Sequence, residues 1–194
     1  MLLYKINFLE KEIKKVVSNL KMGKIVLMPT DTIWGITCDA TNEFSVDRVF
    51  KLKKRDKLKS LIHLVPNITS LEKIVGPLSN NIKKIIKNSL KPTTIVYKNY
   101  QNSIGNIKLK DNTIAIRVVK DKRCKKIISL LGKPIIATSA NVSGEKNPND
   151  FDEISQKIID GVDFVTKMKN KNKFNQPSRI ISIDENDKIL EHRS

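Results

Sequence analysis

The sequence predicts a single α/β domain on a twisted, mixed β-sheet that is flanked by helices. Helical and strand patterns alternate along most of the 194 residues, as they do in domains that layer helices on a sheet. The end of the chain is richer in strand patterns, which favours a mixed sheet over an all-parallel one. We find no internal repeat and no linker long enough to separate two domains, so residues 1–194 are expected to form one domain.

Amphipathic patterns organise the first half of the chain. Apolar side chains recur at helical spacing from Ile13 to Leu20, and Gly23 follows as a helix end. In the second predicted helix, Phe44 is expected to face inward with its apolar neighbours. The elements predicted here are a helix over 10–22, a strand over 24–28, a loop over 29–40, a helix over 43–54, a strand over 60–65 and helices over 69–75 and 79–88.

Shorter apolar runs predict most of the second half. Gly132 ends a predicted helix, and a buried strand follows it directly. The polar segments 99–112 and 167–177 are expected to be flexible loops. The predicted elements are strands over 93–97 and 113–118, a helix over 121–131, a strand over 135–138, a helix over 152–160, and strands over 162–166, 179–183 and 188–191.

The charge balance is strongly basic, with 37 Lys and Arg against 20 Asp and Glu and a net charge of +17. Such an excess is typical of proteins that bind nucleic acid or another polyanion. The excess is carried mainly by Lys, in a chain that is also rich in Ile and Asn and poor in Ala. The same composition is expected from drift in an AT-rich genome, so both interpretations remain open. Arginines within apolar sequence are better candidates for anion binding, because the planar guanidinium fits carboxylate and phosphate.

Several classes of protein are disfavoured by the sequence. No apolar stretch approaches the ~20 residues of a membrane span, and the first residues do not resemble a signal peptide. Cys38 and Cys124 lack the spacing of a metal site, which predicts two reduced thiols in a cytoplasmic protein without a metal centre. The glycine patterns of Rossmann and P-loop nucleotide sites are absent.

Two buried strands end in short polar side chains. The run 133–144 passes from Ile135 and Ile136 to Ser139 and Asn141, and the run 24–32 ends in Thr-Asp-Thr. Such strand ends present backbone N–H groups and small polar side chains that can hold phosphate. The sequence therefore predicts a cleft for a small polar ligand.

Five short motifs carry the chemistry of the chain. Each is weak alone, because a K-x-R at a helix end is usually solvated charge and a serine after proline is usually a turn. The motifs are P-T-D-T-x-W-G over 29–35, K-x-R over 53–55 with Lys59 close behind, a strand that ends at Arg117, S-A-N-x-S-G over 139–144 and Q-P-S-R over 176–179. In this order and spacing they resemble the YrdC-type threonylcarbamoyl-AMP synthases, in the single-domain form, over roughly residues 8–193.

The resemblance implies an enzyme of tRNA modification. Members of this family condense L-threonine, bicarbonate and ATP, supplied with Mg²⁺, into threonylcarbamoyl-AMP and pyrophosphate. A separate transferase complex then moves the threonylcarbamoyl group to adenosine 37 of tRNA. The resemblance also implies an α/β fold with a concave, positively charged cavity.

The resemblance further implies the roles of particular residues. The reaction needs no protein nucleophile, so catalysis is expected to come from positioning and charge neutralisation. Lys53 and Arg55 are the predicted catalytic residues. The predicted ATP-binding residues are Arg55, Lys59, Thr113, Ser139, Asn141 and Arg193, and the predicted threonine-binding residues are Thr32, Arg117 and Ser178. His63 lies one residue out of register with a substrate-contacting histidine of some members, and we assign it no role.

Two other functions remain open. The same fold could bind RNA through its basic concave face without turnover, or belong to a paralogue with a different acyl acceptor. The intact K-x-R and S-A-N-x-S-G motifs favour the synthase. Aromatic residues make up only 5% of the chain, which argues against recognition of single strands by base stacking. Weak tRNA binding remains compatible with either class, and the sequence does not indicate the oligomeric state.

Overall fold

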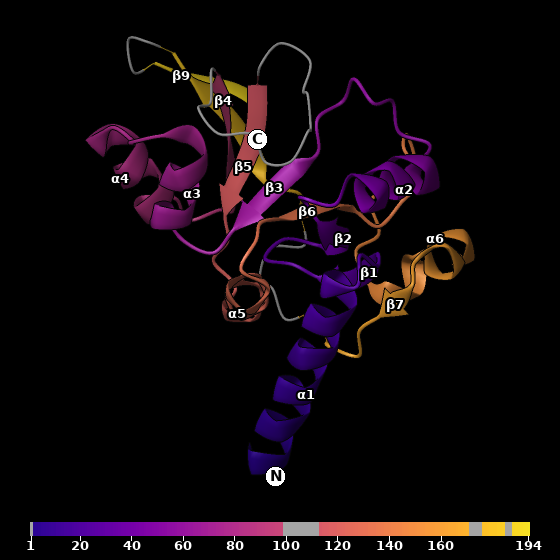
Figure 1. Ribbon diagram of the computed structural model, residues 1–194. Coiled ribbons are helices and arrows are strands. Elements are labelled where there is room, and N and C mark those ends of the chain that lie inside the picture. The colour runs from indigo at the N-terminus through magenta and orange to yellow at the C-terminus, as the bar shows by residue number, and fades with distance from the viewer. Residues whose placement is uncertain (1, 99–112, 171–175, 185–187) are drawn as a thin grey trace.

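The protein is described by a computed structural model that covers residues 2–98, 113–170, 176–184 and 188–194, with side chains from residue 6 onward (Figure 1). Strands occupy much of this part of the chain. They are β1 Val26–Pro29, β2 Trp34–Asp39, β3 Ile62–Val65, β4 Thr93–Lys98, β5 Thr113–Val118, β6 Ile135–Ser139, β7 Phe164–Val165, β8 Arg179–Ile183 and β9 Ile189–Arg193. The helices are α1 Leu2–Lys21, α2 Glu43–Lys53, α3 Ile68–Val75, α4 Asn80–Asn88, α5 Lys122–Leu131 and α6 Gln156–Gly161, with a 3-10 turn at Phe151–Glu153.

The described strands form one sheet in the order β7-β1-β2-β6-β3-β5-β4-β8-β9. The neighbours β1 and β7, β3 and β5, and β4 and β8 run parallel, whereas the other neighbours run antiparallel. The prediction of a mixed sheet flanked by helices is therefore confirmed. The order also places β3 between β6 and β5, although these strands are far apart in the sequence.

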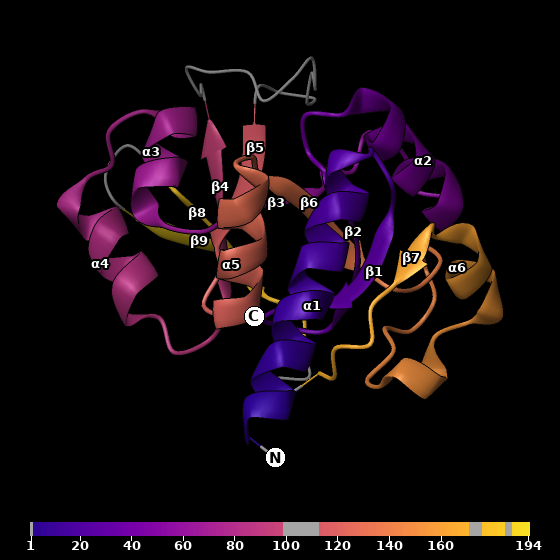
Figure 2. The ribbon, with the colours of Figure 1, turned by 60° about the horizontal axis from the view of Figure 1, so that its bottom comes forward.

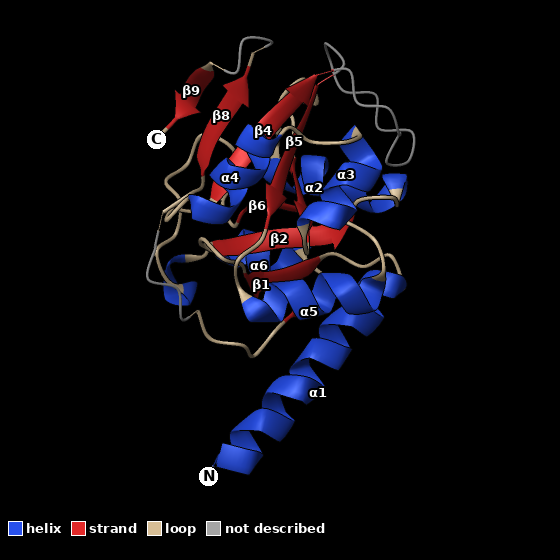
Figure 3. Cartoon of the chain, turned by 90° about the vertical axis from the view of Figure 1, so that its left-hand side faces the viewer, coloured by secondary structure: helices blue, strands red, loops and turns tan. Residues whose placement is uncertain are grey.

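Helices cover the two faces of the sheet differently. One hydrophobic cluster joins α2, α3 and α4 to the strand side chains that point toward them. A second cluster joins α1 and α5, which lie side by side in front of the sheet in Figure 2. The N-terminal part of α1 extends beyond the body of the protein (Figure 3). These two helices cover only part of their face.

Side-chain caps fix where several helices begin. The Asn42 side chain accepts a hydrogen bond from the backbone N–H of Ser45, and Asn67 accepts one from Ser70. Asp121 accepts from the backbone N–H groups of Arg123 and Cys124 at the start of α5. Such caps satisfy backbone donors that have no partner within the helix.

Three predictions about the elements were wrong. The predicted loop over 29–40 contains β2, whose residues are all buried between β1 and β6. The polar residues Thr37 and Asp39 made this strand hard to recognise, because a strand that is covered on both faces shows no regular alternation of polar and apolar residues. Only a tight turn separates it from β1. Phe44 is 72% exposed, with its ring near the Arg48 guanidinium. The helix predicted over 152–160 is divided into a 3-10 turn and α6.

Most of the remaining elements lie close to their predicted positions, but α1 begins at Leu2 and not at residue 10. Strand β5 matches its predicted bounds, and Gly132 ends α5 in the left-handed conformation with a φ of 77°. The segment 99–112, and residues 171–175 within the segment 167–177, fall outside the described residues.

Candidate anion-binding site

A cavity of about 370 Å³ opens on the face that α1 and α5 cover only in part. Side chains from the turn after β1, the end of α2, and strands β3, β5, β6, β8 and β9 meet around it. Its floor is formed by small or apolar side chains that include Ala115 and Ala137. These two residues leave room above the sheet, where larger side chains would fill the space.

Three arginines line this cavity, from three separate parts of the chain: Arg55, Arg117 and Arg193. Arg55 donates from Nε to the Lys59 carbonyl at 3.1 Å and from Nη2 to the Ser60 carbonyl at 2.8 Å. Backbone carbonyls thus hold one edge of this guanidinium. They carry no full charge, so they orient the cation without neutralising it.

Arg193 and Arg117 are held by other groups. Arg193 donates from Nε to the Ser178 carbonyl at 2.9 Å and from Nη2 to the Ser178 hydroxyl at 3.3 Å. Arg117 is 3% exposed and donates from Nη2 to a carboxylate oxygen of Asp31 at 2.8 Å. Among the described lining residues there is no Asp or Glu. The lining therefore favours an anionic ligand.

The electrostatics of the arginines reflect their closeness. Burial lowers the pKa of Arg193, and the positive charges of Arg117 and Arg55 lower it further. Burial also lowers the pKa of Arg55, against the opposing effect of the Asp56 carboxylate. A bound anion would relieve this repulsion between like charges.

Lys53 stabilises the loop that follows β6. Its ammonium donates to the Ser139 carbonyl at 2.6 Å, and to the carbonyl and side-chain oxygens of Asn141 at 2.5 and 3.1 Å. The residue is 1% exposed and does not line the cavity. Burial lowers the pKa of Lys53 to about 8, and the charge of Arg55 acts in the same direction. Lys53 thus connects the K-x-R motif to the S-A-N loop.

Hydroxyl groups form another part of the wall. Thr30 and Thr32 hydrogen-bond through their hydroxyls at 2.9 Å in the turn after β1, and both line the cavity. Ser178 also lines it and shares a hydrogen bond of 2.8 Å with the buried hydroxyl of Thr94. Such side chains can donate or accept, so they suit the mixed polar groups of a small ligand.

The structure brings many of the predicted site residues to this one cavity. Those that line it are Thr32, Arg55, Arg117, Ser139, Ser178 and Arg193. Those that do not are Lys53, Lys59, Thr113 and Asn141. The Lys59 side chain is exposed, and Asn141 points back to the Ser139 hydroxyl, whose hydrogen bond it accepts at 2.6 Å.

Some lining residues were not identified from the sequence. They are Thr30, Ser60, Thr138, Asn147 and His192, besides most of the apolar ones. Thr30 lies within the P-T-D-T motif, and His192 is next to Arg193. Their positions beside predicted site residues were the only indication in the sequence that they could line the cavity. His63 does not line the cavity, whereas its neighbour Ile62 does.

Two further properties concern membranes and metals. Among the described helices, none combines the length and apolar character that a membrane span requires. The described residues also contain no group of three or more His, Cys, Asp or Glu side chains that could hold a metal ion.

Fold and site together define an α/β protein with an arginine- and hydroxyl-lined cavity suited to small anions. The chain belongs to the Sua5/YciO/YrdC family, whose model, described as "Telomere recombination", matches residues 18–193. This confirms the family resemblance recognised in the sequence.

Similar proteins fall in the same family. The chain is 38% identical to a putative threonylcarbamoyl-AMP synthase of Methanocaldococcus jannaschii, over 98% of this chain and 90% of that protein. It is 32% identical to the threonylcarbamoyl-AMP synthase of Wigglesworthia glossinidia brevipalpis, over 76% of this chain and 78% of that protein.

Solved structures share the fold. Sua5 of P. abyssi, crystallised with L-threonine, matches 88% of this chain with a TM-score of 0.74 at 23% identity. This chain spans only 50% of that protein's length. E. coli YciO matches 94% of this chain and 88% of its own, with a TM-score of 0.75 at 17% identity. At these identities the likeness concerns the fold.

Proposed function

We propose that this protein is an L-threonylcarbamoyladenylate synthase, which condenses L-threonine, bicarbonate and ATP into threonylcarbamoyl-AMP and pyrophosphate. The observation that carries the proposal is the convergence of Arg55, Arg117 and Arg193 on one hydroxyl-lined cavity. The names of the curated relatives support it, and so does the L-threonine complex of a protein with the same fold.

The proposed reaction has two steps. The neutral amine of threonine attacks bicarbonate and gives a carbamate, with loss of water. A carbamate oxygen then attacks the α-phosphorus of ATP, and the bond from that phosphorus to the β-phosphate bridging oxygen breaks to release pyrophosphate. Because several anions must come together, orientation and charge neutralisation are the main contributions that the protein can make.

The cavity arginines would divide this work. We assign Arg55 and Arg193 to the ATP phosphates, with Ser139 on the same side of the cavity. The family resemblance also assigns Thr113, Asn141 and the exposed Lys59 side chain to ATP, although these three residues do not line the cavity. We assign Arg117 to the threonine carboxylate, with Thr32 and Ser178 beside it. A guanidinium can bind either kind of oxyanion through two parallel hydrogen bonds.

We assign Lys53 a role through the S-A-N loop. Its three hydrogen bonds are all to Ser139 and Asn141, so in this conformation its ammonium acts on their orientation. Reaching a phosphate would require those hydrogen bonds to break.

Magnesium would enter with the nucleotide. Mg²⁺ prefers oxygen ligands and is commonly bound through substrate phosphates together with few protein groups. The basic and hydroxyl character of the lining fits a Mg–ATP complex that brings its own phosphate ligands. The ion would neutralise charge on those phosphates.

The product would be handed to a threonylcarbamoyl transferase complex that modifies adenosine 37 of tRNA, and we propose the cytoplasm as the compartment. The net charge of +17 favours a second possibility, weak binding of tRNA or other RNA to the basic surface. A non-catalytic RNA-binding module would show RNA affinity that falls steeply with salt and no dependence on threonine.

Pyrophosphate release tests the proposal directly. The protein is incubated with ATP and Mg²⁺, with and without L-threonine and bicarbonate. We expect release only when both co-substrates are present, because the carbamate is the nucleophile. Release that is independent of threonine, or no release at all under any of these conditions, would contradict the synthase assignment.

A further inference from the structure

The turn after β1 places a buried carboxylate directly behind a cavity arginine. Asp31 and Arg117 are 86 residues apart in sequence, and their side chains are 3% and 4% exposed. The distance from Arg117 Nη2 to Asp31 Oδ1 is 2.8 Å. A buried guanidinium without such a partner would be strongly unfavourable, so this contact governs where Arg117 can lie.

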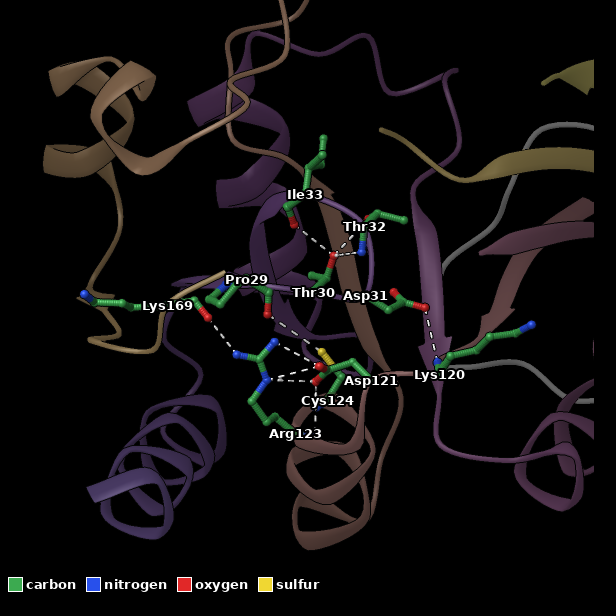
Figure 4. Close-up of polar contacts among 10 residues, drawn as sticks. All are labelled: Pro29, Thr30, Asp31, Thr32, Ile33, Lys120, Asp121, Arg123, Cys124 and Lys169. Atoms are coloured by element: carbon green, nitrogen blue, oxygen red, sulfur yellow. Dashed lines mark hydrogen bonds and ion pairs between the residues drawn. The ribbon is translucent and has the colours of Figure 1, made fainter. Parts of the chain in front are cut away.

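The second oxygen of the same carboxylate is also bonded. Asp31 Oδ2 accepts from the backbone N–H of Lys120 at 3.3 Å, and Figure 4 shows this contact from the turn. The turn itself is fixed by the Thr30 hydroxyl, which donates to the Ile33 carbonyl at 2.9 Å. Asp31 therefore connects the turn to the segment after β5 through both of its oxygens.

The turn also rests against α5. Cys124 Sγ lies 3.8 Å from the Pro29 carbonyl, and Asp121 caps the helix beside it (Figure 4). Arg123 contacts Asp121 and the Lys169 carbonyl on the same side. The turn that carries Asp31 therefore packs against α5, so the position of the Asp31 carboxylate is well defined.

Asp31 lies behind the cavity wall. Its neighbours Thr30 and Thr32 line the cavity and Asp31 does not, so a ligand would meet Arg117 and not its counter-ion. Arg117 Nε is buried and has no hydrogen-bond partner among the described residues. The guanidinium therefore retains donor capacity beyond the Asp31 contact.

We propose that Asp31 is a positioning residue that holds Arg117 in the orientation needed to recognise the carboxylate of the amino-acid substrate. The inference rests on the proposed function, because it assigns the carboxylate to Arg117. The opposite charges of Asp31 and Arg117 compensate each other. Arg55 and Arg193 are held by backbone carbonyls, which do not compensate their charge. The arrangement suits a single carboxylate at Arg117 and phosphates at the other two arginines.

Ligand binding to the full chain tests this role. Trp34 is the only tryptophan of the chain and lines the cavity, so its fluorescence can report binding, with calorimetry as a second measurement. L-threonine is compared with L-threoninamide, which lacks the carboxylate. We expect the wild-type protein to bind threonine at least about 10-fold more tightly than the amide.

The preference for threonine should depend on Asp31. In Asp31→Asn one of the two contacts must be lost, because the amide NH₂ cannot accept a hydrogen bond from Arg117 or from the Lys120 backbone N–H, and Arg117 is then no longer held in its orientation. We expect the ratio of the two affinities to fall to within about 3-fold of one, because the loss falls on the carboxylate contact. Asp31→Glu keeps the charge but moves the carboxylate by one methylene, so its ratio should be intermediate.

Glu12 provides a matched control. It is a buried carboxylate, 2% exposed, that binds the Thr166 hydroxyl and the Lys167 backbone N–H away from the cavity. Glu12→Gln should lower the melting temperature and leave the affinity ratio unchanged. If it lowered the ratio as much as the Asp31 variants, the effect would be a general loss of structure and the inference would be wrong.

The outcomes separate the inference from the function on which it rests. If wild type binds threonine selectively and Asp31→Asn keeps the full ratio, the positioning role is overturned and the proposed function stands. If wild type does not bind threonine, the proposed function itself fails. Should Asp31→Asn not fold, Asp31→Glu decides alone, since a ratio equal to wild type would overturn the inference.

Discussion

The two faces of strands β3, β5 and β6 differ sharply in what their side chains do. On the face toward α2, α3 and α4, large apolar side chains such as Ile116 and Ile136 are buried. On the other face, Ala115, Ala137 and Arg117 line the cavity. Successive residues of a strand point to opposite faces. The two faces therefore share one backbone and differ in the size of their side chains and in the helices that cover them.

The comparison also explains how cations are tolerated beside a core. Lys53 and Arg117 are both nearly inaccessible, and each has oxygen acceptors from a distant segment of the chain. Buried charges are retained when such partners compensate for lost hydration. The cavity face accordingly depends on specific polar contacts, whereas the covered face depends on the burial of apolar area.

The largest effect is expected from a cavity arginine. Arg55→Ala should lower the turnover number by about 100-fold or more, because a charged donor aimed at reacting phosphates contributes strongly to transition-state stabilisation. The measurement is steady-state pyrophosphate release at saturating substrates.

Arg48→Ala is the matched control for that variant. Arg48 pairs with Asp163 away from the cavity, so its loss should change turnover by less than about 3-fold. Equal effects of the two substitutions would remove the distinction between the cavity face and the rest of the surface.

A second effect concerns the contact between Lys53, at the end of α2, and the loop that follows β6. Lys53→Met should lower the free energy of unfolding by about 3 kcal/mol, because it leaves buried oxygens of Ser139 and Asn141 without their donor. Denaturant unfolding measures the change. Lys51→Met, at an exposed position of the same helix, should stay within about 0.5 kcal/mol of wild type. An unchanged Lys53→Met variant would show that these contacts add little stability.

The smallest effect on stability is expected from His63, on the sheet face toward α2, α3 and α4, and only at acidic pH. Burial lowers the pKa of His63 to about 4, although the nearby backbone of Ala115 and Leu61 favours the protonated ring. Its usual pKa is about 6.5, so the unfolded chain binds the proton first as the pH falls. The stability that the neutral ring contributes is therefore present above about pH 6.5 and is lost between that pH and about 4.

Substitution of His63 tests this acid sensitivity. Between pH 7 and 4.5, the wild-type protein should lose about 2 kcal/mol more stability than His63→Leu, which has no group to protonate. Unfolding by denaturant at the two pH values gives the difference. His192→Leu, at an exposed site, should behave as wild type. Equal acid sensitivity of wild type and His63→Leu would mean that His63 does not titrate as expected.

Individual elements show which parts of the fold can be predicted from local sequence patterns. The strand Thr113–Val118 and the end of α5 at Gly132 follow from patterns within a few residues. The strand β2 does not, because it is covered on both faces and so lacks the alternation of a half-exposed strand. Phe44 was wrongly predicted to face the core, because an apolar residue at the start of a helix can be exposed.

The candidate site divides in the same way. Motifs in the sequence predicted Arg55, Arg117, Ser139 and Ser178 as site residues, and all four line one cavity. The contact of Lys53 with the S-A-N loop and that of Asp31 with Arg117 could not be predicted. Both join residues more than 80 positions apart, at sequence separations of 86 to 88.

The sequence by itself determined the types of most elements and the chemical groups available, because periodicity and residue chemistry are local properties of the chain. Only the tertiary structure decided which face of each strand is hollow and which acceptor each buried cation uses. Those outcomes depend on the strand order and on helix packing, which bring distant segments into contact at distances near 3 Å. A hydrogen bond or ion pair forms only at such short range, so its energy is set by the fold rather than by the residue alone.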